Sequence, residues 1–380
     1  MYREMLERVA AERGLAPPET IRIGTVPREK LSEVLGASEG AAATAREAAI
    51  GDVYRLLGLL PGGMDYSTAV RDSLERSAGA VYVPGRREVW LIRDGPLPAS
   101  PDGLAPWEQR LLAHELVHAI QDYHFDLDAL ERAVDSIDSW LALHALLEGD
   151  AVWTESRWTA SALMPGLVDA TALEPPSAAP PPPPALGREF AFMYGSGAEW
   201  VALLRGRDPE AVDRLLRAGG PSATARILHP DIDLTGWSFA GPAVPSSVPS
   251  DDWQLEGTDR LGEFLLRSYL QTGLPSLAAA QAAEGWAGDS LLRYRAAGRS
   301  VLALRVRFRD PKDAGEFAAA HLELLRMRAT TFEIGAAMTT ATRGDGVTVI
   351  QLAPLTDEVT IVFADDPVSA AVLAGFLLNR

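Results

Sequence analysis

The chain has 380 residues, 47% of them hydrophobic, so it is long enough to form two or three globular domains. Its formal net charge of −17, without a basic stripe, argues against a nucleic-acid partner, and no apolar run approaches the roughly 18 residues of a membrane span. The sequence has no cysteine, which excludes disulfide bonds, a thiol nucleophile and a cysteine-ligated zinc site.

Residues 1–60 are predicted to form an N-terminal region that packs on the domain after it. The chain begins with a charged helix rather than a signal peptide. A short strand at Ile21–Ile23 and helices near 27–36 and 42–60 follow. The protein is therefore expected to be cytoplasmic if this is the full chain, and extracytoplasmic if a leader has been removed.

Two apolar runs then flank a turn. Ala80–Val83 and Glu88–Ile92 are rich in β-branched and aromatic residues, and the four residues between them include Pro84 and Gly85. This pattern predicts a β-hairpin.

An HEXXH motif lies inside a single helix predicted over 106–130, where the apolar residues have helical spacing and Pro106 is typical of a helix start. Histidines four positions apart lie one turn apart on the same face, so His114 and His118 can bind one zinc ion. Glu115 lies beside them, where it can accept a proton from a zinc-bound water. The alternative is a structural helix that carries two solvated histidines.

Catalytic zinc usually has three protein ligands and one open position. His124 has the offset of a metzincin's third histidine, but the glycine that turns such a chain back is missing, and six residues are not a whole number of helical turns. Glu148 lies in an apolar helix predicted over 138–163, where a carboxylate needs a partner. We therefore predict Glu148 as the third ligand, the alternative being a surface glutamate near a break at Gly149. This donor set favours zinc without excluding manganese, cobalt or iron.

These motifs resemble the gluzincin peptidases. More closely, the pattern HELVHAIQD followed by LEGDA is similar to a loosely characterised bacterial family of HEXXH metallopeptidases. The likeness covers roughly residues 50 to 300, and outside the zinc motif it is weaker. The segments that carry it are Gly79–Pro84, His114–Asp122, Leu147–Ala151, Ile227–Pro230 and Gly285–Asp289.

The resemblance implies a mostly helical, zincin-like catalytic domain over 61–295. It implies that the hairpin supplies an edge strand, which lies beside the active-site helix and pairs with extended substrate. The roles it implies are zinc ligation by His114, His118 and Glu148, and general-base catalysis by Glu115.

The sequence offers weaker candidates for two further roles, the orientation of a ligand histidine and the stabilisation of an oxyanion. Thermolysin-type gluzincins place an aspartate four residues after the ligand glutamate, to orient a histidine, but Val152 stands at that position here. Asp122 or Asp150 is therefore expected to take this task, unless no residue does. A developing oxyanion needs an electrophile besides zinc, and Tyr194 and His229 follow the ligand helix on segments that can fold back over the site. We predict both as catalytic, although a lone Tyr or His is more often structural.

The rest of the 61–295 domain is predicted to be helical, with two long loops. The proline-rich stretch 174–185 favours polyproline II and is read as a surface loop. A second loop is predicted over 236–249, because it is rich in Gly, Pro and Ser. Helices are predicted near 187–206, 208–218, 258–272 and 274–285.

Residues 296–380 change character and are predicted to form a separate α+β module. His321 is expected on the surface of its helix. Gly344 and Gly346 mark a hairpin. The expected elements are strands at 301–308, 336–343, 347–352 and 359–364 and helices at 311–328 and 367–378.

The sequence therefore predicts an α+β protein that hydrolyses peptide bonds in peptide or protein substrates, with zinc as cofactor. Water activated by the zinc ion attacks the carbonyl, and Glu115 is the general base. One alternative is a zinc hydrolase of a non-peptide amide or ester. Another is a zinc-binding scaffold without turnover, against which Glu115 argues, since a pure metal site does not need that carboxylate.

Overall fold

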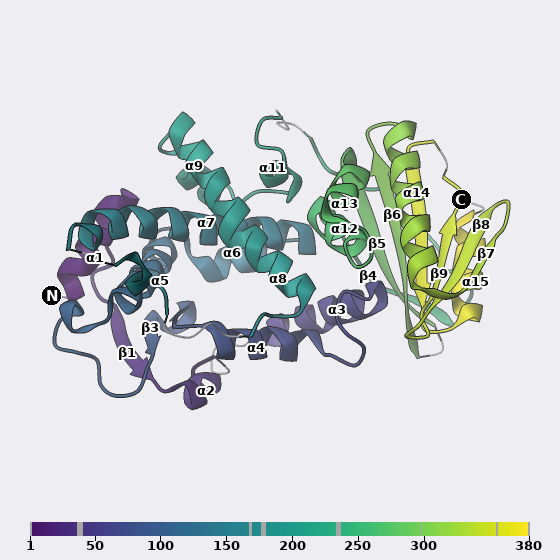
Figure 1. Cartoon of the computed structure of the whole chain (residues 1–380). Helices are drawn as coiled ribbons and strands as arrows, with labels where there is room; N and C mark the ends of the chain where they lie inside the picture. Colours follow the sequence, from purple (N-terminus) through teal and green to yellow (C-terminus); the bar gives the residue numbers. More distant parts are fainter. Residues whose placement is uncertain are drawn as a thin grey trace. The chain divides into compact units, whose positions relative to one another are not determined.

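The expected α+β class is confirmed, with helices in the N-terminal part and a seven-stranded antiparallel sheet in the C-terminal part (Figure 1). The chain forms two compact units, each built from three stretches. The first comprises Met1–Arg46, Ser67–Val134 and Trp140–Pro221, and the second Glu47–Tyr66, Asp135–Ser139 and Ser222–Arg380. The computed structural model describes residues 2–35, 41–166, 169–175, 180–232, 237–296, 298–354 and 356–378.

Helices of the first unit bury their apolar faces against one another and against a small sheet. Leu112, Leu116 and Ile120 of α5 are fully buried in a cluster that also contains Val9 of α1 and Val89 of the sheet. The helices mainly in this unit are α1 (Tyr2–Arg13), α2 (Leu31–Leu35), α4 (Tyr66–Ser77), α5 (Pro106–Phe125), α6 (Leu127–Ala133), α7 (Ile137–Ala162), α8 (Pro184–Phe190), α9 (Gly197–Arg207) and α10 (Ala211–Arg217).

The small sheet contains the predicted hairpin. Its strand order is β1-β3-β2, with β1 (Arg22–Val26) parallel to β3 (Glu88–Ile92) and β2 (Ala80–Val83) antiparallel to β3. The turn closes through Arg87, whose φ is 54°. Strand β2 is thus an edge strand, and it packs against α5.

The single helix predicted over 106–130 is wrong. Helix α5 ends at Phe125, because Asp126 adopts the left-handed conformation with φ of 54°, which aspartate tolerates better than most residues. The Asp126 carboxylate then caps α6 by accepting from the N–H of Ala129 at 2.9 Å. Neither Pro nor Gly marks this break.

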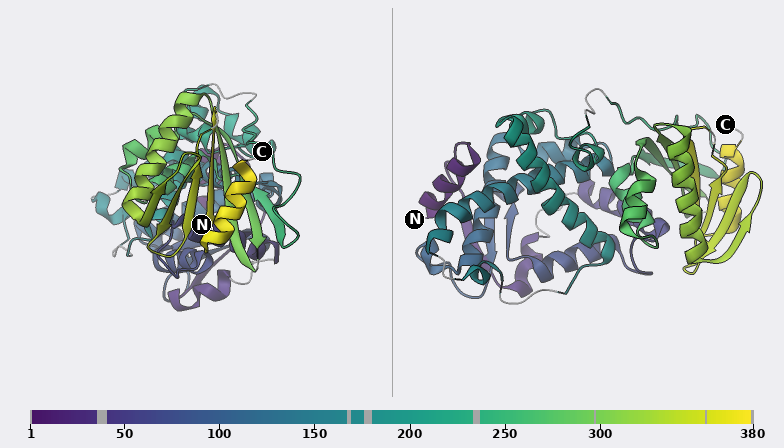
Figure 2. Two further views of the ribbon diagram at one scale, coloured as in Figure 1. Left: turned by 90° about the vertical axis from the view of Figure 1, so that its right-hand side faces the viewer. Right: turned by 45° about the horizontal axis from the view of Figure 1, so that its top comes forward.

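The seven-stranded sheet of the second unit has the order β4-β5-β6-β10-β9-β8-β7. Figure 2 shows helices α14 and α15 on opposite faces of it. The elements are β4 (Trp253–Asp259), α12 (Gly262–Leu270), α13 (Ser276–Ala283), β5 (Trp286–Ala296), β6 (Arg299–Phe308), α14 (Pro311–Arg328), β7 (Ala329–Ile334), β8 (Met338–Arg343), β9 (Thr348–Leu352), β10 (Glu358–Ala364) and α15 (Pro367–Leu378), with the short α11 (Ala225–Leu228) before them.

This sheet begins earlier than the module boundary predicted at 296. Strand β5 pairs with β6 along its whole length, so the predicted boundary falls inside a hairpin. Strands β4, β5 and β7 were not predicted. His321, expected on the surface, is fully buried, because α14 lies against the sheet.

Residues 47–66 belong to the second unit, whereas 47–60 were predicted in the N-terminal region and 61–66 in the domain after it. They include the end of α3 (Ala41–Leu57), which packs its buried Leu56 and Leu57 there. The guanidinium of Arg343 donates to the carbonyl oxygen of Leu56 at 2.6 Å and to that of Arg55 at 3.3 Å. A cation at a helix C-terminus satisfies carbonyls that lack a partner in the helix.

Some predictions fall partly outside the described residues. In the proline-rich stretch these are residues 176–179, in the second loop residue 236, and in the helix near 27–36 residue 36. Among the helices that the structure describes, none combines the length and apolar character needed to cross a membrane.

Candidate metal centre

Two helices of the first unit bring the predicted ligands together. His114 and His118 lie one turn apart on α5, and Glu148 lies on α7. The Nε2 atoms of the two histidines are 3.2 Å apart. The Oε2 atom of Glu148 lies 3.1 Å from Nε2 of His114 and 3.3 Å from Nε2 of His118. Three potential donor atoms thus form a nearly equilateral triangle.

This triangle has the dimensions of a tetrahedral zinc site. Zinc bonds of about 2.0–2.1 Å imply donor atoms about 3.3–3.4 Å apart, close to the three distances in the protein. Two imidazole nitrogens and one carboxylate oxygen are also donors that zinc prefers. The residues present therefore fit the ion that the sequence predicted.

The charges around the triangle also favour a cation. Burial lowers the pKa of His114, but the carboxylates of Glu148 and Glu155 outweigh it and raise this pKa well above the usual value. Burial raises the pKa of Glu148, but the imidazoles of His118 and His114 outweigh it and hold this pKa well below the usual range. A buried carboxylate is costly unless it is paired, and a divalent cation in the triangle would supply such a partner.

Glu115 lies next to the triangle and is held by the edge strand. The backbone N–H of Tyr82 in β2 donates to its carboxylate. Burial raises the pKa of Glu115, and the neighbouring imidazoles only partly offset this effect. Strand β2 therefore orients the carboxylate that was predicted as general base.

The partner of His114 is Glu155, which the sequence did not identify. Its Oε2 lies 3.1 Å from Nδ1 of His114, and its Oε1 accepts from Arg110 at 2.8 Å. Glu155 is seven residues after Glu148, so both carboxylates lie on the same face of α7, two turns apart. The spacing of seven residues between these two glutamates is therefore the sequence signal that could have identified Glu155.

Neither Asp122 nor Asp150 contacts a ligand histidine directly, so that expectation is corrected. Asp122 accepts from the hydroxyl of Tyr82 at 2.7 Å and from the backbone of Leu127 at 3.1 Å. The Nδ1 of His118 instead lies 2.9 Å from Oε1 of Gln121. Asp150 acts one step further out, as the partner of the Gln121 amide.

Tyr194 is also brought to the triangle. Its ring stacks on that of His114 with centroids 5.9 Å apart, and its hydroxyl forms a hydrogen bond with Glu148. Although 40% of the residue is exposed, loss of water around it and the negative charges of Glu148 and Glu115 raise its pKa well above the usual value. Its hydroxyl is therefore a proton-bearing donor.

A π-helical turn over Ala191–Ser196 carries Tyr194, between α8 and α9. Such turns re-aim side chains and are frequent at functional sites. Two glycines hold this segment close to α7. A Cβ at Gly149 would lie 2.3 Å from the backbone of Gly197, and a Cβ at Gly197 would lie 2.1 Å from the carbonyl oxygen of Ala145. Gly149 is therefore a packing residue within α7 and not a helix break.

The other histidines considered have different surroundings. His229, predicted as catalytic, belongs to the second unit, where its Nε2 lies 2.9 Å from both carboxylate oxygens of Glu263. These contacts do not support a catalytic role, which stays a prediction. His144 pairs with Glu131. His124 lies 2.8 Å from the carbonyl oxygen of Ala16, which agrees with the argument against it as a ligand.

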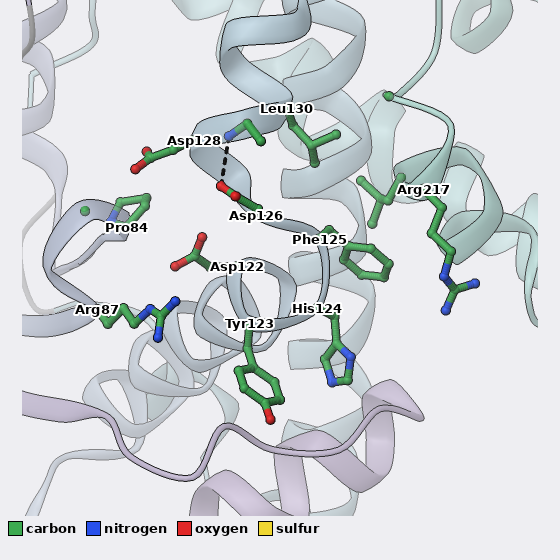
Figure 3. A pocket seen from close by; sticks show the side chains of 14 residues that line it. Pro84, Arg87, Asp122, Tyr123, His124, Phe125, Asp126, Asp128, Leu130 and Arg217 are labelled. Carbon is green, nitrogen blue, oxygen red and sulfur yellow. Dashed lines mark hydrogen bonds between the residues drawn. The ribbon is translucent and has the colours of Figure 1, made fainter.

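A cleft of about 690 Å³ lies beside the last turn of α5. Figure 3 shows Asp122, Tyr123 and His124 along it, with Arg87 from the hairpin turn and Arg217 from α10. The triangle of potential ligands does not line this cleft, although Asp122 is one helical turn from His118.

Comparison with known proteins gives one match. Residues 253–372 match the model of a family described as a domain of unknown function (DUF8575). This match lies in the second unit and does not include the triangle. No curated protein and no solved structure matches the chain.

Proposed function

We propose that the first unit is a zinc-dependent metallopeptidase, with His114, His118 and Glu148 as ligands and Glu115 as general base. The observation that carries the proposal is the convergence of two imidazole nitrogens and a carboxylate oxygen, 3.1 to 3.3 Å apart, beside a fourth group, the carboxylate of Glu115. A structural metal site does not require that fourth group.

Zinc, when bound, supplies Lewis acidity that brings the pKa of a bound water toward 7 and polarises a carbonyl. The protein's own residues then divide the remaining work. Glu115 accepts the proton of the attacking water and returns it to the leaving amine, while the N–H of Tyr82 keeps the carboxylate in place. The hydroxyl of Tyr194 is the candidate donor to the developing oxyanion.

A peptide substrate is favoured by the edge strand beside α5. In the β2–β3 pair, Ile92 donates to the carbonyl oxygen of Gly79 at 2.9 Å, so the polar backbone groups of Ala80 and the carbonyl oxygen of Tyr82 point away from β3, beside the Tyr82 N–H that faces Glu115. An extended peptide binds to a strand edge through groups in this pattern. The same edge also holds the general base, which would bring a bound peptide close to Glu115.

The test compares the wild type with two variants in zinc content and in cleavage of a mixed peptide library. Glu115→Gln keeps the ligands, so it should bind about one zinc ion per chain and lose cleavage by on the order of 10²–10⁴-fold. His118→Ala removes a ligand and should lose both. Glu7→Gln, at a surface pair with Arg3, is the matched control and should retain both.

A wild-type protein that binds no zinc would contradict the proposal. Zinc binding without cleavage in the wild type would favour a scaffold or another substrate. Amide or ester model compounds that are hydrolysed by the wild type, and not by Glu115→Gln, would identify a hydrolase of non-peptide substrates.

A further inference from the structure

A buried glutamine links the second ligand histidine to an ion network. Gln121 is fully buried on α5, one turn after His118. Its Oε1 lies 2.9 Å from Nδ1 of His118. On the other side, its Nε2 lies 3.0 Å from the carbonyl oxygen of Leu147 and 3.0 Å from Oδ2 of Asp150.

The chemistry of these neighbours fixes the orientation of the amide. A carbonyl oxygen and a carboxylate can only accept hydrogen bonds, so the NH₂ group must face Leu147 and Asp150. A flipped amide would turn its own buried oxygen toward two acceptors and leave that oxygen without a donor, at a cost of about 1–3 kcal/mol. The amide oxygen of Gln121 therefore faces His118.

The ion network prevents Asp150 from moving away. Its Oδ2 accepts from Nε of Arg13 at 2.6 Å, and its Oδ1 accepts from Arg205 at 2.8 Å. The side chains of Asp150 and Arg13 are at most 1% exposed. Arg13 is also bound to Asp213 at 2.7 Å, so the network ties α1, α7, α9 and α10 to the carboxylate.

The tautomer of His118 follows from the amide orientation. Because the oxygen of Gln121 accepts, Nδ1 of a neutral His118 must carry the hydrogen, and Nε2 must present its lone pair to His114 and Glu148. This is the tautomer that binds a metal through Nε2. The aspartate thus acts on the histidine through the glutamine.

We propose that Gln121 is a positioning residue, which with Asp150 fixes the metal-binding tautomer and ring orientation of His118 before any metal binds. The effect of this Asp150–Gln121–His118 relay on zinc affinity rests on the function proposed above, whereas the tautomer of His118 does not depend on zinc. Loss of a group that orients a ligand histidine typically weakens metal binding by about 10–100-fold.

The experiment uses Gln121→Met, which keeps the size of the side chain and removes both hydrogen-bonding groups. Gln109→Met, on the first turn of the same helix, is the matched control, because among the described residues its amide donates only to the carbonyl oxygen of Leu104. Zinc affinity is measured by competition with a chelator. Gln121→Met should bind zinc about 10–100-fold more weakly than the wild type, and Gln109→Met within about twofold.

The second measurement reads the tautomer directly. Long-range ¹H–¹⁵N correlation spectra are recorded on metal-free, histidine-labelled protein at an alkaline pH, and His118→Ala identifies the signal. Wild-type His118 should carry its hydrogen on Nδ1, and Gln121→Met should shift the population toward Nε2–H. If Gln121→Met does not fold, the wild-type spectrum alone still decides the tautomer.

Two failures can be told apart. A wild-type spectrum with the hydrogen on Nε2, or unchanged zinc affinity in a folded Gln121→Met, would overturn the relay while leaving the proposed hydrolase intact. Absence of zinc binding in the wild type would overturn the proposed function, and the Nδ1–H tautomer in the same protein would still support the positioning role of Gln121.

Discussion

The two ligand histidines have unequal partners, a carboxylate for His114 and an amide for His118. A carboxylate that accepts from Nδ1 increases the basicity of Nε2, whereas a neutral amide does so less. Arg110 holds Glu155 in place from the other side. The partner that increases basicity more is therefore bound to Nδ1 of His114, the more buried of the two histidines.

Glu155→Gln should weaken zinc binding by about 10–100-fold, because it removes the negative partner of His114 with almost no change in volume. Chelator competition measures the affinity. Glu12→Gln, at a surface pair with Arg157, is the control and should bind zinc like the wild type. Equal affinity in all three proteins would show that Glu155 does not act on the metal.

His321 makes the stability of the second unit depend on pH. Burial lowers its pKa to about 4 from 6.5, although a hydrogen bond to Gln351 partly opposes this. The unfolded chain therefore binds more protons between these values, so the stabilising contribution is complete above pH 6.5 and is lost as the pH falls to about 4. The shift corresponds to about 3 kcal/mol.

The measurement is the free energy of unfolding of the wild type and of His321→Gln, at several pH values from 7 to 4. The wild type should lose about 3 kcal/mol more than the variant over this range, because the glutamine does not titrate. Parallel curves for the two proteins would contradict the assignment.

Local spacing in the sequence predicted the triangle but not the groups around it. His114 and His118 are four residues apart on one helix, and Glu148 follows from an apolar run, so each is a local pattern. The contact between Glu155 and His114 depends instead on how far α7 continues and on the rotation of two helices about their axes. His229 was predicted as catalytic from its local sequence, but that sequence does not reveal that the residue belongs to the second unit.

At the scale of the elements, the close approach of α7 and α9 depends on two glycines. Gly149 adjoins Glu148, and Gly197 follows the turn that carries Tyr194. The backbones can therefore approach where the third ligand meets the candidate oxyanion donor. Any side chain at either position would separate these two groups.

Gly149→Ala should destabilise the protein by about 1–3 kcal/mol, because the clash with the backbone of Gly197 exceeds the gain of about 1 kcal/mol in helix propensity. Gly206→Ala, in α9, meets nothing within 4 Å and should be neutral or stabilising. Urea unfolding compares the two variants, and stabilisation by Gly149→Ala would contradict the packing described for α7 and α9.

Helices and strands whose apolar residues repeat at a clear interval were predictable from the sequence. Strands that depend mainly on pairing with a neighbouring strand were not. The hairpin of β2 and β3, helix α14 and helix α15 follow from alternating or helical patterns, and the structure confirms them. Strand β7 has no buried residue and no alternation of buried and exposed side chains, so its sequence has little to distinguish it from a loop. The break at Asp126 depends on one left-handed residue, which no pattern revealed.

At the scale of the molecule, each unit is assembled from three separate stretches of the chain. Arg343 is only 3% exposed and joins β8 to the end of α3, which is far away in sequence. Arg328 adds a hydrogen bond to the carbonyl oxygen of Gly58 at 3.4 Å. The second unit is therefore incomplete without residues 47–66, and a fragment with the limits of the matched family, 253–372, would lack them.

Arg343→Met should lower the free energy of unfolding by about 2–4 kcal/mol, because it leaves buried carbonyl oxygens of α3 without a charged donor. Arg299→Met, at an exposed arginine that pairs with Asp366, should change it by less than about 1 kcal/mol. Thermal and urea unfolding of the full chain provide the comparison. Equal stability of the two variants would show that Arg343 does not hold α3 to the sheet.

The path of the chain between the units also has a consequence during synthesis. Leu56 and Arg343 are 287 residues apart, and a ribosome needs about 15–60 s to make such a length at about 5–20 residues per second. Throughout this time the apolar end of α3 lacks its native partners and is a target for chaperones or for aggregation. The nascent chain therefore exposes this apolar segment for most of its translation, whatever reaction the finished protein catalyses.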